Sequence, residues 1–586
     1  MNPSKIVQLQ KYLSKKNIQH FIINRTDEFL SEYIAPYAER LNWLTNFSGS
    51  AGRAIISQES ATLFVDGRYT VQAKEQINKN EISLDHLDNF WVVLKELYKT
   101  KGILAVDTRL HSIQEIKKIQ NILKISKSNI CFLNTNPIDE LWKDQPPYPQ
   151  STIFNHPLKY AGLDRKNKIK KFQKILQTNK IDYYILSALD SIAWLLNIRG
   201  NNIEYIPIAF ANLLIPSEGK IILFISLEKI QQDLQKEIKS SCDVHSFQEM
   251  EKVIKNIPTN KCVGMDYQST SFYYKNLCES VGLETHHNIN PCIQDKAVKN
   301  EVELEGARQA NIRDGVSIAK FLFWLKNSDN INKISEIDAA NYLYNIRKNN
   351  DLFYSLSFDT ISAIGKHAAL PHYRVSDESN LQLENNSIYL VDSGAQYKDG
   401  TTDITRTIIL GNPSEEHKDR FTRVLKGHIA IATHIFSKGT TGADIDHLAR
   451  KSLNEAGYDY DHGTGHGIGS FLSVHEGPQR IAKKSEIKSA ELLPGMIISN
   501  EPGYYKENSF GIRIENLIIV KEKTSNLIEF ETISWAPIDC DLIEKKLLND
   551  SEIQWINRYH SIVYEKIQNF LSLEERRWLQ KVTKTL

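Results

Sequence analysis

The chain has 586 residues, with 72 basic and 71 acidic side chains and a formal net charge of +1 at pH 7. This balance gives none of the basic excess typical of nucleic-acid-binding proteins, so no nucleic-acid partner is expected. A chain of 586 residues is too long for one hydrophobic core, and two to four domains are expected.

The N-terminal run MNPSKIVQLQKYLSKKNIQHFII lacks the apolar core of a signal peptide. No stretch approaches the roughly 18 apolar residues of a membrane span, so no membrane partner is expected. The six cysteines contain no CxxC pair and are widely scattered, which is typical of reduced thiols and not of a disulfide framework or a zinc site. These features predict a cytoplasmic protein.

The first half of the chain contains a repeat. Residues 5–24 (KIVQLQKYLSKKNIQHFIIN) and 168–187 (KIKKFQKILQTNKIDYYILS) align without a gap, and in both a helical apolar pattern precedes a short apolar run. The motif Trp-Leu-x-Asn-x-x-Gly then follows in both copies, at 43–49 and 194–200. Two matches in the same order predict a pair of related α/β domains.

Two stretches mark the predicted domain boundaries. The first is proline-rich and spans 145–156, and the second lies near 291–299. The predicted domains are residues 1–155, 156–295 and 296–586.

Helical patterns are visible at several other points. One begins at Glu301, and another runs over 556–570 and is followed by a capping box from Ser572 to Glu575. The lysine-rich run 165–174 is predicted to form a solvated helix face.

Two aspartates flank a polar, glycine-containing turn in the run YLVDSGAQYKDGTTDITRT, residues 389–407. Asp392 follows an apolar strand, and Asp403 lies in the β-branched alternation of a second predicted strand. A hairpin would bring the two carboxylates side by side, and because adjacent carboxylates repel, a shared proton or a cation has to hold them. Taken alone, both could also be ordinary turn residues.

Three histidines lie within fourteen residues: His462 and His466 in the run HGTGHGIG, and His475 in VHEG. The four glycines disfavour a helix, and the HExxH motif of zinc proteases is missing. The glycines instead indicate a backbone that passes close to a ligand or a metal.

Two further carboxylates follow. Glu501 ends an apolar strand and enters a Pro-Gly turn, whereas Glu515 shares a predicted strand face with Arg513 because side chains alternate along a strand. An arginine beside a carboxylate keeps it ionised and oriented, which favours a supporting role for Arg513.

The donor set is oxygen-rich and contains no thiolate, which favours Mn²⁺, Co²⁺ or Zn²⁺ in a two-ion site over a structural zinc. Two such ions can lower the pKa of a bridging water, and nearby histidines can stabilise an oxyanion or move protons. The five candidate ligands are Asp392, Asp403, His466, Glu501 and Glu515.

In this order and spacing, the segments resemble the pita-bread metallopeptidases, and specifically the cytosolic, three-domain Xaa-Pro aminopeptidases. The runs DSGAQYKDGTTDITRT, HGTGHGIGSFLSVHEGP, EPGYY and GIRIEN carry the resemblance, together with FSGSAGRAII and LFVDGRY near the N-terminus. It extends over essentially the whole chain. It implies two α/β domains of the creatinase/prolidase N-terminal type followed by an α+β pita-bread catalytic domain.

The resemblance also implies an activity. The enzyme would be a homodimeric hydrolase that removes the N-terminal residue from peptides with proline in second position, by means of a hydroxide that bridges two divalent ions, most commonly Mn²⁺. Asp403 and Glu515 would bridge the ions, and Glu501 would also act as general base. His475 matches a histidine that steadies the tetrahedral intermediate, and His462 one that contacts the substrate beyond the scissile bond.

Further roles rest on the same resemblance. His372 matches a histidine near the substrate's N-terminal amine, but its context departs from the family's usual residues and His367 is a nearby rival. Arg513 and Tyr505 look like supporting residues. Asn500 stands where an acidic residue is common, and a tuning effect is expected there.

Three alternatives remain open. A prolidase-type dipeptidase would have the same metals, but the duplicated first half and the length disfavour it. Methionine aminopeptidases resemble the third segment alone. Pita-bread proteins that serve as chaperone or interaction modules lack the metal ligands, whereas all five matching positions carry suitable side chains here.

Overall fold

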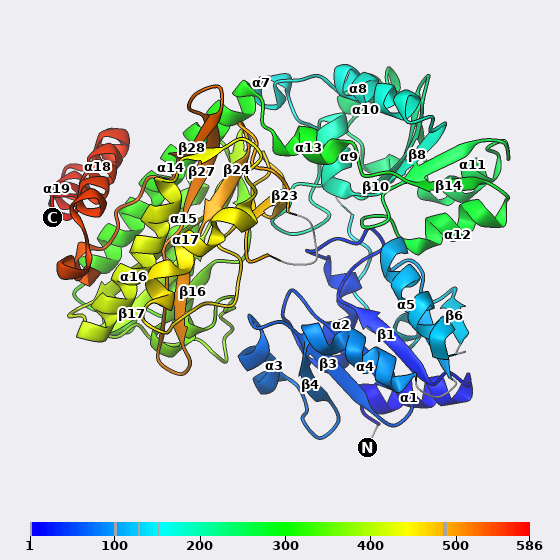
Figure 1. The fold of residues 1–586 in the computed structure, drawn as a ribbon, viewed down its shortest axis with the longest axis horizontal. Helices are drawn as coiled ribbons and strands as arrows, with labels where there is room; N and C mark the ends of the chain where they lie inside the picture. The colour runs from blue at the N-terminus through cyan, green and yellow to red at the C-terminus, as the bar shows by residue number, and fades with distance from the viewer. Residues whose placement is uncertain (1–2, 99–101, 127–128, 151, 485–488) are drawn as a thin grey trace. The chain divides into compact units, whose positions relative to one another are not determined.

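The computed structural model describes residues 3–98, 102–126, 129–150, 152–484 and 489–586. The chain forms two compact units (Figure 1). The first contains Met1–Pro157 and Leu163–Cys292, and the second contains Leu158–Gly162 and Ile293–Leu586. The finer division at residues 155 and 295 stays a prediction.

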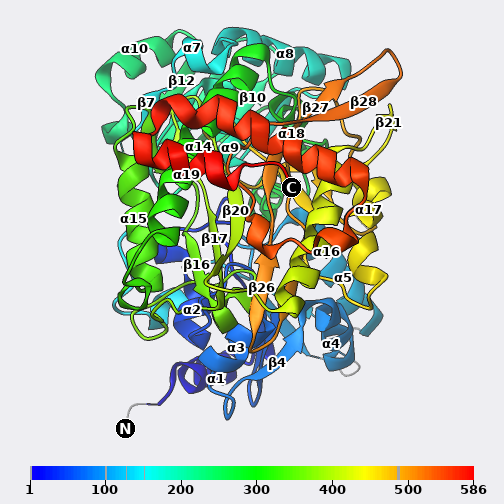
Figure 2. The ribbon, with the colours of Figure 1, turned by 90° about the vertical axis from the view of Figure 1, so that its left-hand side faces the viewer.

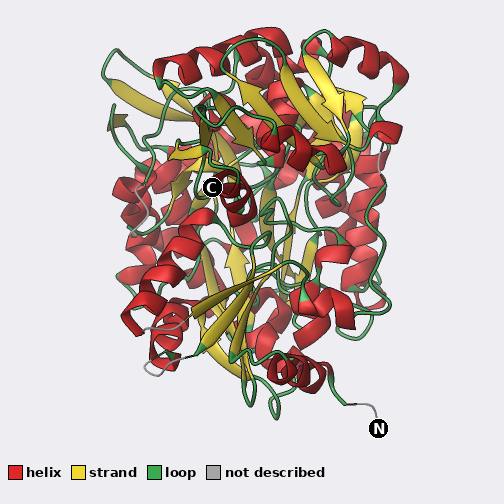
Figure 3. Cartoon of the chain, turned by 90° about the vertical axis from the view of Figure 1, so that its right-hand side faces the viewer, coloured by secondary structure: helices red, strands yellow, loops and turns green. Residues whose placement is uncertain are grey.

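The first unit contains two six-stranded sheets of matching order, β4-β3-β2-β1-β5-β6 and β12-β11-β10-β8-β13-β14. In both, the first strand of the repeat pairs antiparallel with one neighbour and parallel with the other. The duplicated α/β architecture is therefore confirmed, and Figure 3 shows helices alongside the strands of both sheets. The strands are β1 (His20–Asn24), β2 (Arg53–Ser57), β3 (Ala61–Val65), β4 (Ser83–His86), β5 (Ile103–Asp107), β6 (Asn129–Leu133), β8 (Tyr183–Leu186), β10 (Ala211–Pro216), β11 (Ile221–Ile225), β12 (Cys242–His245), β13 (Cys262–Met265) and β14 (Glu284–His287).

The repeated asparagine has a structural reason. Helix α2 (Arg40–Thr45) ends at Asn46 with φ 62°, and α9 (Leu189–Leu196) ends at Asn197 with φ 50°. Asparagine tolerates this left-handed conformation better than most residues, so it ends the helix at the same point in both copies.

One hydrophobic cluster spans the two halves of the first unit, and the first half has a further cluster of its own. A single cluster of buried side chains contains Ile22 and Ile55 from the first sheet together with Ile185, Leu214 and Val263 from the second. Helices α5 (Ile113–Ser126) and α12 (Phe272–Ser280) contact each other beside it. The halves are therefore held together by apolar burial.

The prediction of a solvated lysine face on α8 (Arg165–Thr178) is wrong at Lys168. Its side chain is only 3% exposed, and its Nζ donates to Trp194 O at 2.9 Å and to Asn197 Oδ1 at 2.8 Å. The ammonium group thus satisfies the carbonyls at the end of α9, which a charge pattern along one helix does not reveal.

The second unit joins antiparallel sheets to long helices. A three-stranded sheet has the order β16-β17-β20, and a six-stranded sheet has the order β21-β28-β27-β24-β22-β23. Helix α14 (Glu301–Lys326) begins at the predicted position, behind a capping box formed by Asn300 and Glu303. The other elements are α15 (Glu336–Lys348), β16 (Ile361–Ile364), β17 (Ser387–Ser393), β20 (Ile404–Leu410), α16 (Glu415–Ala432), β21 (Phe436–Ser437), α17 (Gly442–Asn454), β22 (Gly465–Gly467), β23 (Glu476–Ile481), β24 (Ile497–Asn500), β27 (Asn516–Glu522) and β28 (Leu527–Thr532).

The C-terminal helices α18 (Asp550–Ile567) and α19 (Leu573–Val582) lie beside α14 (Figure 2). The predicted capping box is confirmed, because Glu575 N donates to Ser572 Oγ and Ser572 N donates to Glu575 Oε2. The predicted helical pattern over 556–570 extends too far, because the α-helix ends at Ile567 and Phe570, which is 61% exposed, lies in the 3-10 turn that follows.

Within the described ranges, none of the helices combines the length and hydropathy that a membrane span requires. All six cysteines are free thiols.

Candidate metal centre

The predicted hairpin that carries the two aspartates is present. Strands β17 and β20 pair antiparallel, and Asp392 lies opposite Thr405. Asp403 precedes β20 by one residue, so it lies at the strand end and not within the strand as predicted. A side chain at Gly394 would come within 1.9 Å of Thr402 O, so glycine is required where the two arms of the connection between the strands pack against each other.

The glycine-rich histidine segment forms β22 and not a helix, as predicted. A side chain at Gly465 would come within 2.0 Å of Ser499 O, so the close neighbour is the backbone of β24. His466 N donates to Ser499 Oγ at 3.0 Å, and this hydroxyl donates to Glu501 Oε1 at 3.2 Å. Ser499 therefore connects His466 to Glu501, which leaves the end of β24 at the predicted turn.

The side chains of these strands converge on one small volume. Ligand atoms of Asp403, His466 and Glu515 all lie within 4.8 Å of one another. His466 Nε2 is 3.5 Å from Asp403 Oδ2 and 3.5 Å from Glu501 Oε1. Donors that each lie about 2.0–2.2 Å from a shared cation have separations of this order.

The carboxylates lie in a buried environment that disfavours their charge. Burial raises the pKa of Asp403 and of Glu515 well above the usual range, and the neighbouring carboxylates raise both further. Burial also raises the pKa of Glu501 to about 7, although Arg513 opposes this shift. Protons or cations are therefore needed to offset the repulsion within the cluster.

Arg513 anchors one side of the cluster. Its Nη2 donates to Asp392 Oδ2 at 2.5 Å, its Nη1 to Tyr505 OH at 2.6 Å and its Nε to Thr405 Oγ1 at 3.2 Å. The other oxygen of the buried carboxylate, Asp392 Oδ1, has no hydrogen-bond partner among the described residues. A carboxylate with one oxygen fixed and the other without a donor suits a cation ligand.

Glu515 follows the end of β26 (Phe510–Arg513). The predicted single strand carrying Arg513 and Glu515 is interrupted between them, but both side chains still reach the cluster. Thr405 Oγ1 donates to Glu515 Oε2 at 2.8 Å and accepts from Arg513 Nε. Sequence reasoning missed Thr405, for which the alternation in the run TDITRT was the available signal.

Two of the predicted histidines lie beside the carboxylates or their supports. The rings of His466 and His475 meet edge to face with centroids 4.3 Å apart. His462 Nε2 lies 2.9 Å from Tyr505 OH, the hydroxyl that Arg513 also contacts.

The remaining histidine assignment is between His372 and His367. His367 Nδ1 lies 3.0 Å and 3.1 Å from the two oxygens of the buried carboxylate of Glu336, and its ring stacks on Tyr373. His372 is partly buried in the turn after helix η6 (Gly365–Ala369), which packs against β17 and β26. His367 therefore has a structural function, and His372 stays the candidate.

A buried ion cluster behind His475 was not predicted. The carboxylate of Glu476 accepts a hydrogen bond from Lys296 Nζ at 2.6 Å and another from Lys299 Nζ, and all three residues are buried. Glu476 pairs with Gly467 across β22 and β23. The cluster thus fixes the backbone between His466 and His475.

The side-chain amide of Asn500 donates its hydrogen bond to the backbone of α16 and not to the carboxylate cluster. Its Nδ2 donates to His428 O at 2.9 Å, and His428 Nδ1 lies 3.0 Å from Asn500 O. Burial lowers the pKa of His428 to about 3, so this imidazole is neutral and acts as a structural link between α16 and β24.

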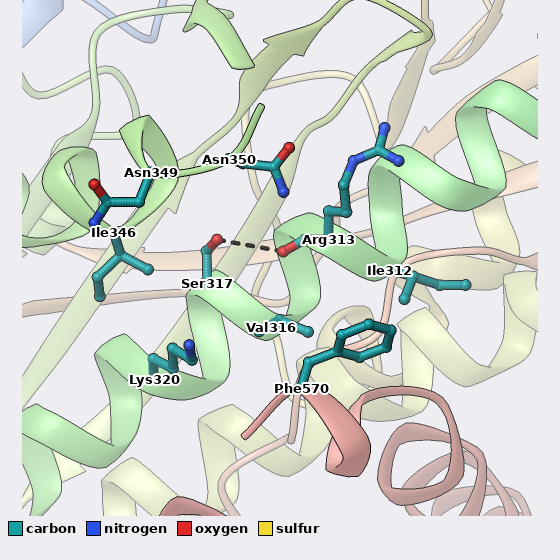
Figure 4. A pocket seen from close by; sticks show the side chains of 9 residues that line it. All are labelled: Ile312, Arg313, Val316, Ser317, Lys320, Ile346, Asn349, Asn350 and Phe570. Atoms are coloured by element: carbon teal, nitrogen blue, oxygen red, sulfur yellow. Dashed lines mark hydrogen bonds between the residues drawn. The ribbon is translucent and has the colours of Figure 1, made fainter. Parts of the chain in front are cut away.

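A separate hollow of about 180 Å³ lies between α14, the end of α15 and Phe570 (Figure 4). Its polar lining includes Arg313, Ser317 and Lys320, and Ser317 Oγ donates to Arg313 O at 3.3 Å. Among the residues that the structure describes, no carboxylate lines it, so it does not share the chemistry of the metal centre.

Comparison with known proteins agrees with this geometry. The pattern of Metallopeptidase family M24 matches residues 305–522, and that of the C-terminal region of peptidase M24 matches 526–586. Two patterns of the creatinase/prolidase N-terminal domain match residues 5–138 and 144–303. A probable Xaa-Pro aminopeptidase P of Talaromyces marneffei is 38% identical over 606 residues, which cover 99% of this chain and 92% of the relative. The chain belongs to metallopeptidase family M24.

Other M24 relatives show the same extent of similarity. A probable Xaa-Pro aminopeptidase P of Paracoccidioides brasiliensis is 36% identical over 99% of both chains. The X-prolyl aminopeptidase of Caenorhabditis elegans, described as a cytosolic enzyme with a di-nuclear active site, superposes with a TM-score of 0.93 and is 31% identical over 99% of both chains. A Xaa-Pro dipeptidase of Bacillus anthracis is 25% identical with a TM-score of 0.54, and it covers 64% of this chain and 99% of its own.

Membership of the M24 family confirms the predicted fold class, two related α/β domains followed by a pita-bread catalytic domain. It also confirms that the chain is a metallopeptidase and disfavours the non-enzymatic alternative.

Proposed function

We propose that the protein is a metal-dependent aminopeptidase that removes the N-terminal residue from peptides with proline in second position. The observation that supports the metal chemistry is an excess of negative groups. Four carboxylates lie together, and Arg513 supplies one guanidinium that contacts them. The proline specificity is supported by relatives that are named for it and match 99% of this chain.

The proposed ligands of two divalent cations are Asp392, Asp403, His466, Glu501 and Glu515, with Asp403 and Glu515 bridging. Mn²⁺ is the proposed metal, and Zn²⁺ and Co²⁺ suit the same donors. When bound, the ions supply the charge that polarises the scissile carbonyl and lowers the pKa of a bridging water. The donor-free oxygen of Asp392 and the mutual repulsion of the carboxylates support this assignment.

Glu501 is the proposed general base. Its Oε1 lies 3.5 Å from His466 Nε2, so the carboxylate is beside the proposed metal position and can accept a proton from a water held there. Ser499 Oγ donates to its Oε1 at 3.2 Å and so fixes the orientation of the carboxyl group.

The histidines have proposed roles around the substrate. His475, edge to face with His466, would donate to the oxyanion of the tetrahedral intermediate. His462, held by Tyr505, would contact the substrate beyond the scissile bond, and His372 would lie near its N-terminal amine. Arg513 and Tyr505 position these groups without contacting the substrate.

The prolidase alternative has weaker support, because the Bacillus anthracis dipeptidase covers 64% of this chain whereas the aminopeptidases cover 99%. We also propose a cytoplasmic homodimer. The cytosolic description of the Caenorhabditis elegans enzyme supports the location, and the oligomeric state is testable by sedimentation.

The test is a peptide assay with mass-spectrometric detection. The protein is stripped with a chelator, Mn²⁺ is restored, and Arg-Pro-Pro, Arg-Pro and Arg-Ala-Ala are offered. Release of arginine mainly from Arg-Pro-Pro, and only with metal, is the expected result. Cleavage confined to Arg-Pro would establish a prolidase, and no cleavage with metal bound would contradict both.

Substitutions give the second arm of this test. Asp403→Ala and Glu501→Ala are each expected to abolish turnover, whereas Glu529→Ala, at a carboxylate on β28 paired with Lys523, should leave it unchanged. Full activity in either of the first two variants would exclude the proposed scheme.

A further inference from the structure

An irregular segment, residues 458–464, joins helix α17 to strand β22 and carries His462. All of its residues are described, and none of them belongs to a helix or a strand, so its backbone groups have no regular ladder to pair with. Buried backbone carbonyls nearly always have a hydrogen-bond partner. In this segment two of the partners come from one side chain of α17, and that side chain decides where the backbone of His462 lies.

The side chain is that of Arg450, which is 3% exposed. Its Nη1 donates to Tyr460 O at 2.7 Å, and its Nη2 donates to His462 O at 2.7 Å. Its Nε donates to Asp446 Oδ2 at 2.7 Å, one turn earlier in the same helix. A planar guanidinium can make these bonds at once because its N–H groups point in different directions. Arg450 therefore fixes the backbone at residues 460–462.

The imidazole of His462 depends on this backbone for its contacts. Its Nε2 lies 2.9 Å from Tyr505 OH, and its ring centroid lies 4.8 Å from that of Tyr460. Tyr505 belongs to another element, β25 (Gly503–Lys506), so a shift of residues 460–462 would change the distance between the imidazole and this hydroxyl.

The far end of the segment is fixed separately, at Thr464. Its Oγ1 donates to Asp446 Oδ1 at 2.6 Å, and its carbonyl accepts from Glu501 N at 2.8 Å. Neither bond uses Arg450. The backbone beside the proposed metal ligands His466 and Glu501 should therefore stay in place when Arg450 is changed and Asp446 is retained.

We propose that Arg450 is a positioning residue for His462. It acts on the substrate through the backbone that carries this histidine and does not contact the substrate itself. The inference rests on the proposed function, in which His462 contacts the substrate beyond the scissile bond. The effect of Arg450 then lies in substrate binding and not in metal binding, whereas an ion pair that only stabilises α17 would affect neither selectively.

Peptide kinetics test the path through His462. Arg450→Lys keeps the charge beside Asp446, but one ammonium nitrogen cannot occupy the three positions of the guanidinium nitrogens. The KM for Arg-Pro-Pro should rise about three- to tenfold, while kcat and Mn²⁺ affinity change less than about twofold. In a His462→Ala background the same change should leave KM unaltered, because the group through which Arg450 acts is gone. An equal rise of KM in both backgrounds overturns the proposal.

Arg423→Lys is the matched control. Arg423, on α16, donates from Nε to Asp419 Oδ2 at 3.0 Å and from Nη1 to Ser452 O at 3.0 Å. It therefore combines an ion pair within its own helix with a bond to a backbone carbonyl, as Arg450 does, but that carbonyl lies within α17. This variant should leave KM, kcat and metal affinity unchanged.

Nuclear magnetic resonance on the full-length protein tests the position of His462 without relying on peptidase activity. With isotopically labelled histidine, the His462 signal is identified by its loss in His462→Ala. Arg450→Lys should shift this signal and leave that of His475 in place, whereas Arg423→Lys should shift neither. An unshifted His462 signal overturns the proposal. Failure of the unmodified protein to cleave any of the peptides would instead contradict the proposed function.

Asp459→Asn covers the case in which Arg450→Lys does not fold. Asp459 is exposed, and its Oδ1 accepts from Arg450 Nη1 at 2.8 Å and from Tyr460 N at 2.9 Å. Asparagine keeps an oxygen for the backbone N–H but weakens the charge-assisted bond to the guanidinium. The His462 signal should therefore shift in this variant, and an unshifted signal overturns the proposal.

Discussion

Arg513 and Asp392, which are 121 residues apart in the chain, are joined by a hydrogen bond of 2.5 Å from Nη2 to Oδ2. The same guanidinium contacts Tyr505 and Thr405, so one side chain connects a proposed metal ligand, the support of His462 and the support of Glu515. The planar fork of arginine makes these three contacts possible at once.

Arg513→Lys therefore tests whether this geometry matters beyond its charge. Lysine keeps the positive charge but cannot reproduce three divergent N–H bonds. We expect Mn²⁺ affinity or kcat to fall by roughly 10–100-fold, as for other groups that orient metal ligands. Metal titration calorimetry and peptide turnover measure the two effects.

The matched control is Arg308→Lys. Arg308 donates from Nε and Nη2 to the two carboxylate oxygens of Glu531, on a partly exposed surface. This variant should leave metal affinity and kcat unchanged. An Arg513→Lys enzyme with the same metal affinity and kcat as the unmodified protein would show that only the charge is needed.

Asp403→Asn should separate activity from stability. Asp403 is buried beside Glu515, Asp392 and Glu501, whose charges raise its pKa. Removing its charge relieves repulsion in the metal-free protein, so the chelated variant should melt several degrees higher while turnover is lost.

Differential scanning calorimetry with chelator measures the melting temperature, and the peptide assay measures turnover. Asp541→Asn, at an exposed carboxylate 3.4 Å from Lys326 Nζ, is the control and should change neither quantity. A lower melting temperature for chelated Asp403→Asn would mean that the carboxylates do not repel one another as inferred.

The stability of the metal-free protein should depend on pH. The pKa of Glu501 is raised to about 7, so the folded state holds its proton more tightly than the unfolded state does. The resulting contribution to the free energy of unfolding is present below the ordinary carboxyl pKa and is lost as pH rises through about 7. The melting temperature of chelated protein should therefore fall between about pH 5 and about pH 8.

The affinity for metal should depend on pH in the opposite sense to the stability of the metal-free protein. Cations displace protons from the carboxylates, so Mn²⁺ affinity should rise with pH and binding should release protons. Calorimetry in two buffers of different ionisation enthalpy counts the released protons. Proton uptake, or affinity independent of pH, would contradict the assignment of these residues as ligands.

The buried ion cluster predicts a large stability effect away from the metal. Glu476→Gln would leave Lys296 and Lys299 buried without their counter-charge, which costs about 3–5 kcal/mol in comparable sites. We expect a lower melting temperature and a lower kcat, because Glu476 fixes the backbone beside His475. Glu529→Gln, at an exposed ion pair with Lys523, should cost no more than about 1 kcal/mol. A Glu476→Gln variant as stable as this control would show that the lysines find other partners.

The sequence predicted those parts of the site that are encoded locally. Strand alternation placed Asp392 and Asp403 on one hairpin, and the Pro-Gly turn placed Glu501 at a strand end. The glycine spacing correctly excluded a helix around His466.

The parts that were missed depend on contacts between distant segments. Glu476 lies 177 and 180 residues from its two lysines, and no local pattern relates them. Lys168 was predicted to be solvated because it belongs to a lysine-rich run, but the end of another helix offers it two oxygen acceptors. The apolar pattern in the sequence extended to Phe570, whereas the α-helix ends at Ile567.

The single hydrophobic cluster shared by the two sheets of the first unit has a consequence for how that unit unfolds. Ile22 on one sheet and Leu214 on the other are buried in the same cluster, although the first copy also has a second core of its own that includes Leu9, Leu41 and Phe47. The duplicated halves should therefore open as one cooperative unit in hydrogen exchange, with matching protection in both sheets. Two recognisable sequence modules thus share one buried cluster, and a fragment that contains only one of them would expose its side of that cluster to water.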